Sequence, residues 1–221
     1  YPELNGKIMA GLANTYRESG WLPEWASPGH RDCMIGSNSA PIIADAFLKG
    51  ALEDGDDIET LLEAVLKNAT VESGRPVRSV GREGLDFYNS LGYVPYDVGV
   101  NENTARTLEY AYADFTIAKM AEALGKDEIA EKYYRQSLNY KNVFDPSTNL
   151  MRGKNEDGSF QSPFNPLKWG DAFTEGNSLH YTWSVFHDVQ GLINLMGGDE
   201  AFTAQLDHVF EMPPDFDDSY Y

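Results

Sequence analysis

The stretch TARTLEYAYADFTIAKMAEALGK, residues 104–126, gives the clearest indication of secondary structure in this chain of 221 residues. Asn103 or Thr104 can cap a helix at its start, and Gly125 provides a stop at its end. Between these points, small and apolar residues recur at helical spacing, at Leu108, Ala111, Phe115, Ala118 and Ala121. The pattern predicts one long helix over these residues.

Helical periodicity recurs on both sides of this stretch. The further helical segments are near residues 4–16, 42–47, 58–66, 85–91, 127–142, 177–196 and 200–210. Short glycine turns such as Met196-Gly197-Gly198 join some helices, and long loops rich in aromatic residues join others. No β alternation competes with this pattern. It predicts an all-α fold, an α/α toroid of helical hairpins whose long loops lie on the active-site face.

The composition excludes several classes of partner. The chain has 17 Lys and Arg against 35 Asp and Glu, which gives a net charge of −18. Such an acidic surface repels phosphate, so we expect neither nucleic acid nor an anionic membrane as a partner. No apolar run approaches the ~20 residues of a membrane span. Because Cys33 is the only cysteine, an internal disulfide and a cysteine-rich zinc site are excluded.

Carboxylates beside aromatic residues are the main candidates for chemistry. Glycoside hydrolysis uses two carboxyl groups, and aromatic faces stack on sugar rings. Glu175 ends a long aromatic loop, residues 145–175, just before a predicted helix. Burial among Phe173, Tyr181 and Trp183 would raise the pKa of Glu175 and make it a usable general acid. Alternatively, Glu175 only stabilises the positive end of that helix.

Other residues have two readings each. Trp21 and Trp25 flank Pro23 in a loop, where exposed indoles either stack on sugars or anchor the loop. Trp169, in the loop before Glu175, is a third candidate sugar contact. Glu109 either points into the site or accepts internal hydrogen bonds. Asn68-Ala69-Thr70 is a glycosylation sequon, but it lies at the end of a predicted helix and carries little weight.

Four segments, in this order, resemble glycoside hydrolase family 92. They read GWLPEWASPGHRDCMIGSNSAPIIADAFLKG (20–50), TARTLEYAYADFTIAKMAEALGK (104–126), YRQSLNYKNVFDPSTNLMRG (134–153) and TEGNSLHYTWSVFHDVQGLINLMGG (174–198). Members of this family are exo-acting α-mannosidases, mostly bacterial, calcium-dependent and inverting. They have an N-terminal β-sandwich domain and a C-terminal (α/α)6 toroid. The resemblance implies that residues 1–221 form part of that catalytic toroid, with the sandwich domain and the rest of the toroid absent.

The resemblance also assigns roles to residues. The general acid of the family is the Glu of a Glu-Gly-Asn motif, which matches Glu175, and the Asn of that motif lies near the calcium site, which implies a metal role for Asn177. Where the family continues with Ala, Trp and Gln, this chain has Ser178, Leu179 and His180. We expect His180 to contact substrate. The general base of the family lies farther downstream, and no residue of this chain is assigned to it.

These matches imply an enzyme that removes terminal α-linked mannose from mannan or N-glycan chains by calcium-assisted inverting hydrolysis. They also imply export to the periplasm, the cell surface or the medium. Without a general base, the isolated chain is expected to be inactive, and its incomplete ring is expected to be covered by self-association or by the rest of the chain. Two alternatives remain: a non-catalytic helical module that binds carbohydrate or serves as a scaffold, and another α/α-toroid carbohydrate enzyme such as a lyase.

Overall fold

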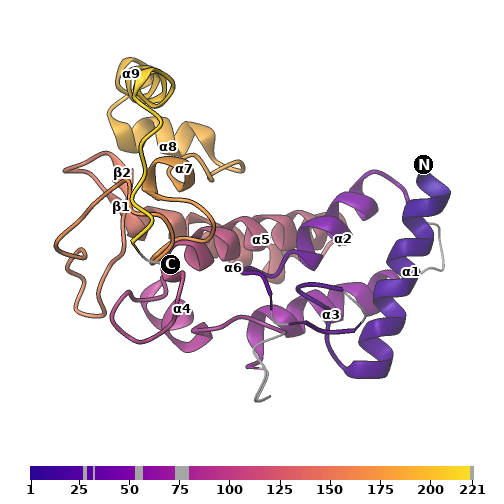
Figure 1. Ribbon diagram of the computed structural model, residues 1–221. Coiled ribbons are helices and arrows are strands. Elements are labelled where there is room, and N and C mark those ends of the chain that lie inside the picture. The colour runs from indigo at the N-terminus through magenta and orange to yellow at the C-terminus, as the bar shows by residue number, and fades with distance from the viewer. Residues whose placement is uncertain (27–28, 32, 53–56, 73–79, 220–221) are drawn as a thin grey trace. The chain divides into compact units, whose positions relative to one another are not determined.

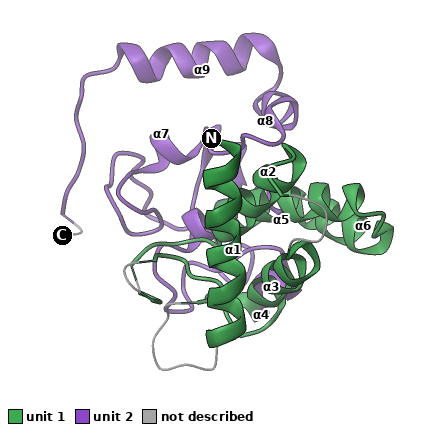
Figure 2. Ribbon diagram, turned by 90° about the vertical axis from the view of Figure 1, so that its right-hand side faces the viewer, with its two compact units in different colours: residues 1–85, 109–138 green, residues 86–108, 139–221 purple. Residues whose placement is uncertain are grey.

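The computed structural model describes residues 1–26, 29–31, 33–52, 57–72 and 80–219. These residues are mainly helical, as the sequence predicts, and the sheet among them is a single hairpin of two short strands (Figure 1). The chain divides into two compact units (Figure 2). Unit 1 comprises residues 1–85 and 109–138, and unit 2 comprises residues 86–108 and 139–221. The all-α class is therefore confirmed, and the closed ring of a toroid stays a prediction.

Unit 1 is a helical bundle around an apolar core. Its helices α1 (Pro2–Ser19), α2 (Ser39–Leu48) and α3 (Ile58–Thr70) pack against one another. The larger part of α5 (Asn103–Ala123) and α6 (Asp127–Gln136) belong to the same unit. The core includes the fully buried side chains of Met9, Leu22, Ile43, Leu61, Val65, Ile117 and Met120. Leu22 lies in the loop after α1, and the other six lie on α1, α2, α3 and α5.

Asn68, on α3, fastens the loop that follows α1. Its Oδ1 accepts a hydrogen bond from the backbone N–H of Leu22 at 3.2 Å, and its Nδ2 donates to the Leu22 carbonyl at 3.0 Å. The Asn68 side chain thereby satisfies both backbone groups of a residue that is itself fully buried. Because Asn68 is 1% exposed, the folded chain does not present the sequon for glycosylation.

A buried ion pair holds α5 in unit 1. Arg82 Nη2 lies 2.7 Å from Asp114 Oδ1, and the two side chains are 1% and 0% exposed. The Arg82 guanidinium also lies 5.0 Å from the centre of the Tyr110 ring, within range of a cation–π contact. Asp114 therefore has a structural role.

Unit 2 combines short helices with long loops. It contains most of α4 (Leu85–Leu91), the first turn and a half of α5, and most of the 3₁₀ helix η1 (Ser137–Val143). The strands β1 (Phe144–Asp145) and β2 (Leu150–Met151) pair antiparallel, with Phe144 opposite Met151. The helices α7 (Ser178–Tyr181), α8 (Val189–Met196) and α9 (Asp199–Glu211) follow. The helix predicted over 127–142 thus ends as α-helix at Gln136 and continues as the tighter η1.

The single helix predicted over 177–196 is wrong, because the chain turns between α7 and α8. Asp188 starts a new helix: its Oδ1 accepts a hydrogen bond from Gly191 N–H at 2.9 Å, and its Oδ2 accepts one from the Tyr140 hydroxyl at 2.7 Å. These two bonds fix Asp188 as the N-cap of α8. Beyond this point α8 packs against α9, and no residue of α9 is fully buried.

No helix in the described part of the chain is both long and apolar enough to cross a lipid bilayer.

Candidate active site

Glu175 lies on a tight turn in unit 2, which we call the Glu175 turn and define as residues 173–177. The backbone φ of Glu175 is 46°, in the left-handed region that residues other than glycine rarely adopt. Two contacts hold the turn: the Tyr181 hydroxyl donates to the Thr174 carbonyl at 2.8 Å, and the Phe173 and Tyr181 rings stack at 5.3 Å. Non-glycine residues in this conformation concentrate at functional sites.

The side chain of Glu175 is exposed, so the expectation that aromatic neighbours bury it is wrong for this chain. Phe173 is buried and stacks on Tyr181, so these rings pack against each other. The indole of Trp183 instead meets the Phe202 ring of α9 edge-on at 5.4 Å. The turn therefore fixes the backbone of Glu175 and leaves its carboxylate open to a ligand.

Asn177 caps α7. Its Oδ1 accepts hydrogen bonds from the backbone N–H groups of Leu179 at 3.0 Å and His180 at 3.3 Å. The His180 ring also contacts Asn177: its Nδ1 lies 2.7 Å from the Asn177 Oδ1 and 3.3 Å from the Asn177 backbone nitrogen. Asn177 is 2% exposed, so its amide oxygen is committed to the helix start. In the described residues, moreover, no three His, Cys, Asp or Glu side chains come together as a metal site.

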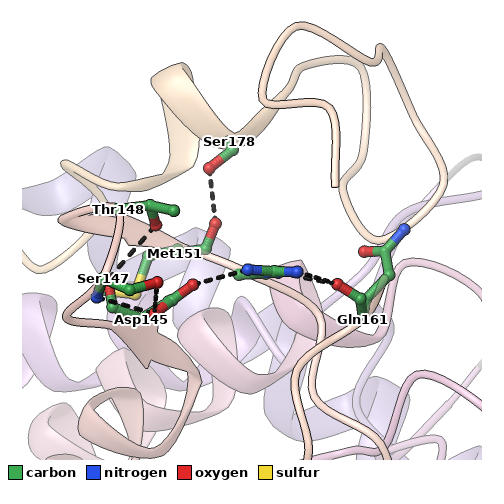
Figure 3. Close-up of polar contacts among 7 residues, drawn as sticks. Asp145, Ser147, Thr148, Met151, Gln161 and Ser178 are labelled. Atoms are coloured by element: carbon green, nitrogen blue, oxygen red, sulfur yellow. Dashed lines mark hydrogen bonds and ion pairs between the residues drawn. The ribbon is translucent and has the colours of Figure 1, made fainter. Parts of the chain in front are cut away.

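Two hydroxyl groups, of Ser178 in α7 and of Thr182 just after it, hold this helix against strand β2. The Ser178 hydroxyl points at Met151 and donates to its carbonyl at 2.5 Å (Figure 3). Met151 N–H donates to Thr182 Oγ1 at 2.9 Å. The serine that departs from the family motif at position 178 therefore has a clear structural use. It fixes the helix that follows the Glu175 turn against the hairpin.

The hairpin itself is held by Arg152. Its Nη1 lies 2.8 Å from Asp145 Oδ2, and its Nε donates to the Gln161 carbonyl at 2.8 Å (Figure 3). Burial of Asp145 opposes ionisation, but hydrogen bonds from Ser147 and Arg152 outweigh it and hold the pKa of Asp145 below its ordinary value. Asp145 therefore stays ionised and, through Arg152, stabilises the hairpin on which α7 packs.

Trp169 and His180 come together beside the Glu175 turn. Gly170 N–H donates to the Gly176 carbonyl at 2.8 Å, which ties the residue after Trp169 to the residue after Glu175. The Trp169 and His180 rings meet edge-on at 5.5 Å. Two of the candidate substrate contacts and the candidate acid therefore share one part of unit 2.

Phe216 joins this group, and sequence reasoning missed it. Trp169 N–H donates to the Asp217 carbonyl at 2.7 Å, and Asp217 N–H donates to the Leu167 carbonyl at 2.9 Å. These bonds place the Phe216 ring 5.5 Å from Trp169. Two prolines before Phe216 are a local signal for extended chain, but no local signal names the loop that such a chain will pair with.

The two loop tryptophans of unit 1 differ from each other. Trp25 is 43% exposed, whereas Trp21 is 7% exposed, so the expectation of an exposed indole is wrong for Trp21. The Lys67 ammonium lies 4.8 Å from the centre of the Trp21 ring. Trp21 therefore follows the alternative reading and anchors its loop against α3.

Glu109, also in unit 1, is a largely buried carboxyl group. Burial raises the pKa of Glu109 to about 7. Within the described residues, no hydrogen bond or ion pair reaches its carboxylate, so the reading of Glu109 as an internal acceptor finds no donor there. Glu109 packs closely against Gly36: a Cβ added to Gly36 would lie 3.1 Å from the Cβ of Glu109.

Comparison with known proteins identifies the family. Residues 1–220 match the model of the glycosyl hydrolase family 92 catalytic domain. An uncharacterised secreted glycosidase of Arthroderma benhamiae is 33% identical over 90% of this chain and 30% of its own length. The structure of a family 92 inverting mannosidase from Bacteroides thetaiotaomicron matches 100% of this chain and 29% of its own, with 47% identity and a TM-score of 0.90.

A second solved structure is similar over nearly the whole chain. It is a family 92 α-mannosidase of Bacteroides thetaiotaomicron in complex with mannoimidazole, with 34% identity and a TM-score of 0.85 over 97% of this chain and 28% of its own. The chain thus spans less than a third of the length of each of these relatives. A family match over residues 1–220 and this degree of identity show that the chain belongs to glycosyl hydrolase family 92.

Proposed function

We propose that this chain supplies the general acid of an α-mannosidase that removes terminal mannose from a glycan with inversion. The observation that carries the proposal is the Glu175 turn, which presents an exposed carboxylate from a constrained backbone beside Trp169 and His180. Family membership supports it, because the similar solved structures are of mannosidases.

An inverting glycosidase needs two carboxyl groups on opposite sides of the bond that breaks. One donates a proton to the glycosidic oxygen, and the other removes a proton from the attacking water, about 6.5–9.5 Å away. In our proposal Glu175 is the proton donor. A sugar bound over the exposed carboxylate excludes bulk water from the place where the proton is transferred.

We also propose that the general base is supplied by residues outside this chain, because we assign that role to none of the 221 residues. The chain alone is then inactive toward mannosides. The substrate is a mannose-bearing glycan, and the protein is exported, in keeping with the similar glycosidase that is described as secreted. Fractionation of the host cells tests export: recovery of the protein in the cytoplasm alone would contradict it.

Calcium dependence is proposed for the whole enzyme only, because the described residues of this chain do not fit a calcium site by themselves. Asn177 offers one neutral oxygen, which already accepts two backbone hydrogen bonds, while calcium prefers six to eight oxygen ligands. We therefore propose that the acidic ligands lie elsewhere. Calorimetric titration of the 221-residue chain should detect no calcium binding, and binding tighter than about 1 mM would contradict this arrangement.

The decisive experiment is Glu175→Gln in the gene product that contains these residues. Turnover of an α-mannobiose needs protonation of a poor leaving group, so its kcat should fall about 10²- to 10⁴-fold. Turnover of α-mannosyl fluoride needs no such proton and should stay within about threefold of the wild-type value. Glu156→Gln, which removes the charge of another exposed glutamate of unit 2, is the matched control and should change neither rate. Near wild-type cleavage of mannobiose by Glu175→Gln would refute the assignment.

A further inference from the structure

Phe216 is an exposed aromatic residue on a firmly held segment. Its side chain is 60% exposed, although the backbone of the next residue, Asp217, makes two hydrogen bonds to the loop that carries Trp169. The Asp217 carboxylate adds two more contacts, since Asn165 Nδ2 donates to it at 2.9 Å and Ser219 N–H donates to it at 3.1 Å. The chain thus fixes a large apolar ring in contact with water, where the ring gains little from burial.

The position of this ring relative to the Glu175 turn follows from backbone hydrogen bonds within unit 2. Asp217 pairs with Trp169, and the neighbouring Gly170 pairs with Gly176, which adjoins Glu175. Three chain segments, residues 165–171, 173–177 and 212–219, therefore lie side by side. The Trp169 and Phe216 planes meet at 52° with their centres 5.5 Å apart, so the two rings form an angled pair rather than a closed stack.

We propose that Trp169 and Phe216 form an aromatic platform for the leaving-group sugar, the glycan residue that remains after terminal mannose is removed. The inference rests on the proposed function. Pyranose rings carry a face of C–H groups that packs against aromatic rings. The general acid acts on the oxygen that joins the terminal mannose to the next sugar. The Gly170–Gly176 bond joins the Trp169 loop to the Glu175 turn, and the Asp217 bonds join Phe216 to the Trp169 loop, so both rings are placed to contact that next sugar.

In this proposal Phe216 contacts the leaving-group sugar. It therefore sets specificity for substrates in which the terminal mannose is linked to another sugar. Its loss should affect a substrate with a sugar leaving group and spare a substrate without one. The platform would favour a leaving group that offers a flat apolar face. A small leaving group such as fluoride would not engage it.

The test is Phe216→Ala in the gene product that contains these residues, assayed on two substrates. For the α-mannobiose that the wild-type protein cleaves fastest, kcat/KM should fall about 5- to 20-fold, as expected for the loss of one stacking contact. For α-mannosyl fluoride, kcat/KM should stay within about twofold. Phe216→Tyr keeps the ring face and should retain most of the activity on mannobiose.

Phe210→Ala is the matched control, because Phe210 is 82% exposed on α9 and lies outside the platform. It should leave both substrates unaffected. Equal losses on the two substrates in Phe216→Ala would mark a structural role and overturn the platform, as would an unchanged rate on mannobiose. If the wild-type protein cleaves neither substrate, the proposed function itself fails, and the inference fails with it.

Discussion

Replacing Asn68 tests the account of how the loop after α1 is held. In Asn68→Ala, Leu22 loses the partners of both its N–H and its carbonyl, at 3.2 and 3.0 Å, while remaining fully buried. An unsatisfied buried backbone group costs about 1–3 kcal/mol. Taking the lower half of that range for each group gives about 3 kcal/mol for the pair, or a factor of about 150 in the equilibrium constant for opening.

Hydrogen exchange measured by mass spectrometry can detect this change. Backbone amides of the buried face of α3, such as that of Val65, report the opening of unit 1 and should exchange about 100-fold faster in Asn68→Ala. Thr70→Ala is the matched control, because it also removes the sequon but disturbs only a hydrogen bond within the helix, from Thr70 Oγ1 to the Leu66 carbonyl. It should change the free energy of opening by less than about 0.5 kcal/mol.

Equal exchange rates in the two variants would refute the reasoning, because they would show that the hydrogen bonds of the Asn68 side chain do not stabilise unit 1 against opening. A change in apparent mass of the wild-type protein after treatment with a glycan-releasing enzyme, mapped to Asn68, would also refute it. A side chain that is 1% exposed and bonded at both ends is not available for modification.

Three further predictions follow from unit 1 and unit 2. Burial raises the pKa of Glu109 from 4.5 to about 7, so the folded chain binds a proton at this carboxylate more tightly than the unfolded chain does. The free energy of unfolding should therefore fall by up to about 3 kcal/mol as the pH rises from 4.5 to 7. Glu109→Gln should flatten this slope in urea titrations, and an unchanged slope would contradict the assigned pKa. Asp114→Ala removes the carboxylate 2.7 Å from the buried Arg82 guanidinium and should cost about 3–5 kcal/mol, much of it recovered in the double variant R82M/D114L, as thermal melts would show. A methyl group on Gly191 would collide with both the Tyr140 hydroxyl and the Asp188 carboxylate that caps α8, so Gly191→Ala should lower stability by about 1–3 kcal/mol in thermal melts; an unchanged melting temperature would contradict the packing.

Local signals predicted the helices well where caps and stops were clear. The long helix starts at Asn103 and ends at Ala123, two residues before the glycine that was expected to stop it. Likewise α1 ends where Gly20 adopts φ 78° and donates its N–H to the Tyr16 carbonyl. These residues act through contacts within one helical turn, so the sequence around them is sufficient.

The sequence was insufficient where a contact from far along the chain decides the outcome. Helical periodicity continues through residues 177–196, but the bond from the Tyr140 hydroxyl to Asp188 helps to start a second helix inside that stretch. Trp21 was expected to be exposed because it lies in a loop, yet α3 covers it with Lys67.

The candidate site shows the same division. The Glu-Gly-Asn motif identified Glu175 and Asn177, and aromatic content pointed to Trp169. The exposure of Glu175 and the presence of Phe216 depend on how separate loops pair, which periodicity does not report. Motifs therefore named the candidate residues, and only the folded chain shows their surroundings.

The α8–α9 hairpin is fastened to the rest of unit 2 at two separate ends. Thr182 is bonded to β2 before the hairpin begins, and Asp217 is bonded to the Trp169 loop after it ends, while no residue of α9 is fully buried. Changes in length or sequence at the turn between α8 and α9 are therefore compatible with an unchanged Glu175 turn, because the residues of α9 that follow are not buried. This makes the turn between α8 and α9, at Gly197 and Gly198, a suitable insertion point for a fluorescent reporter or an affinity tag, and a natural place for homologues to diverge.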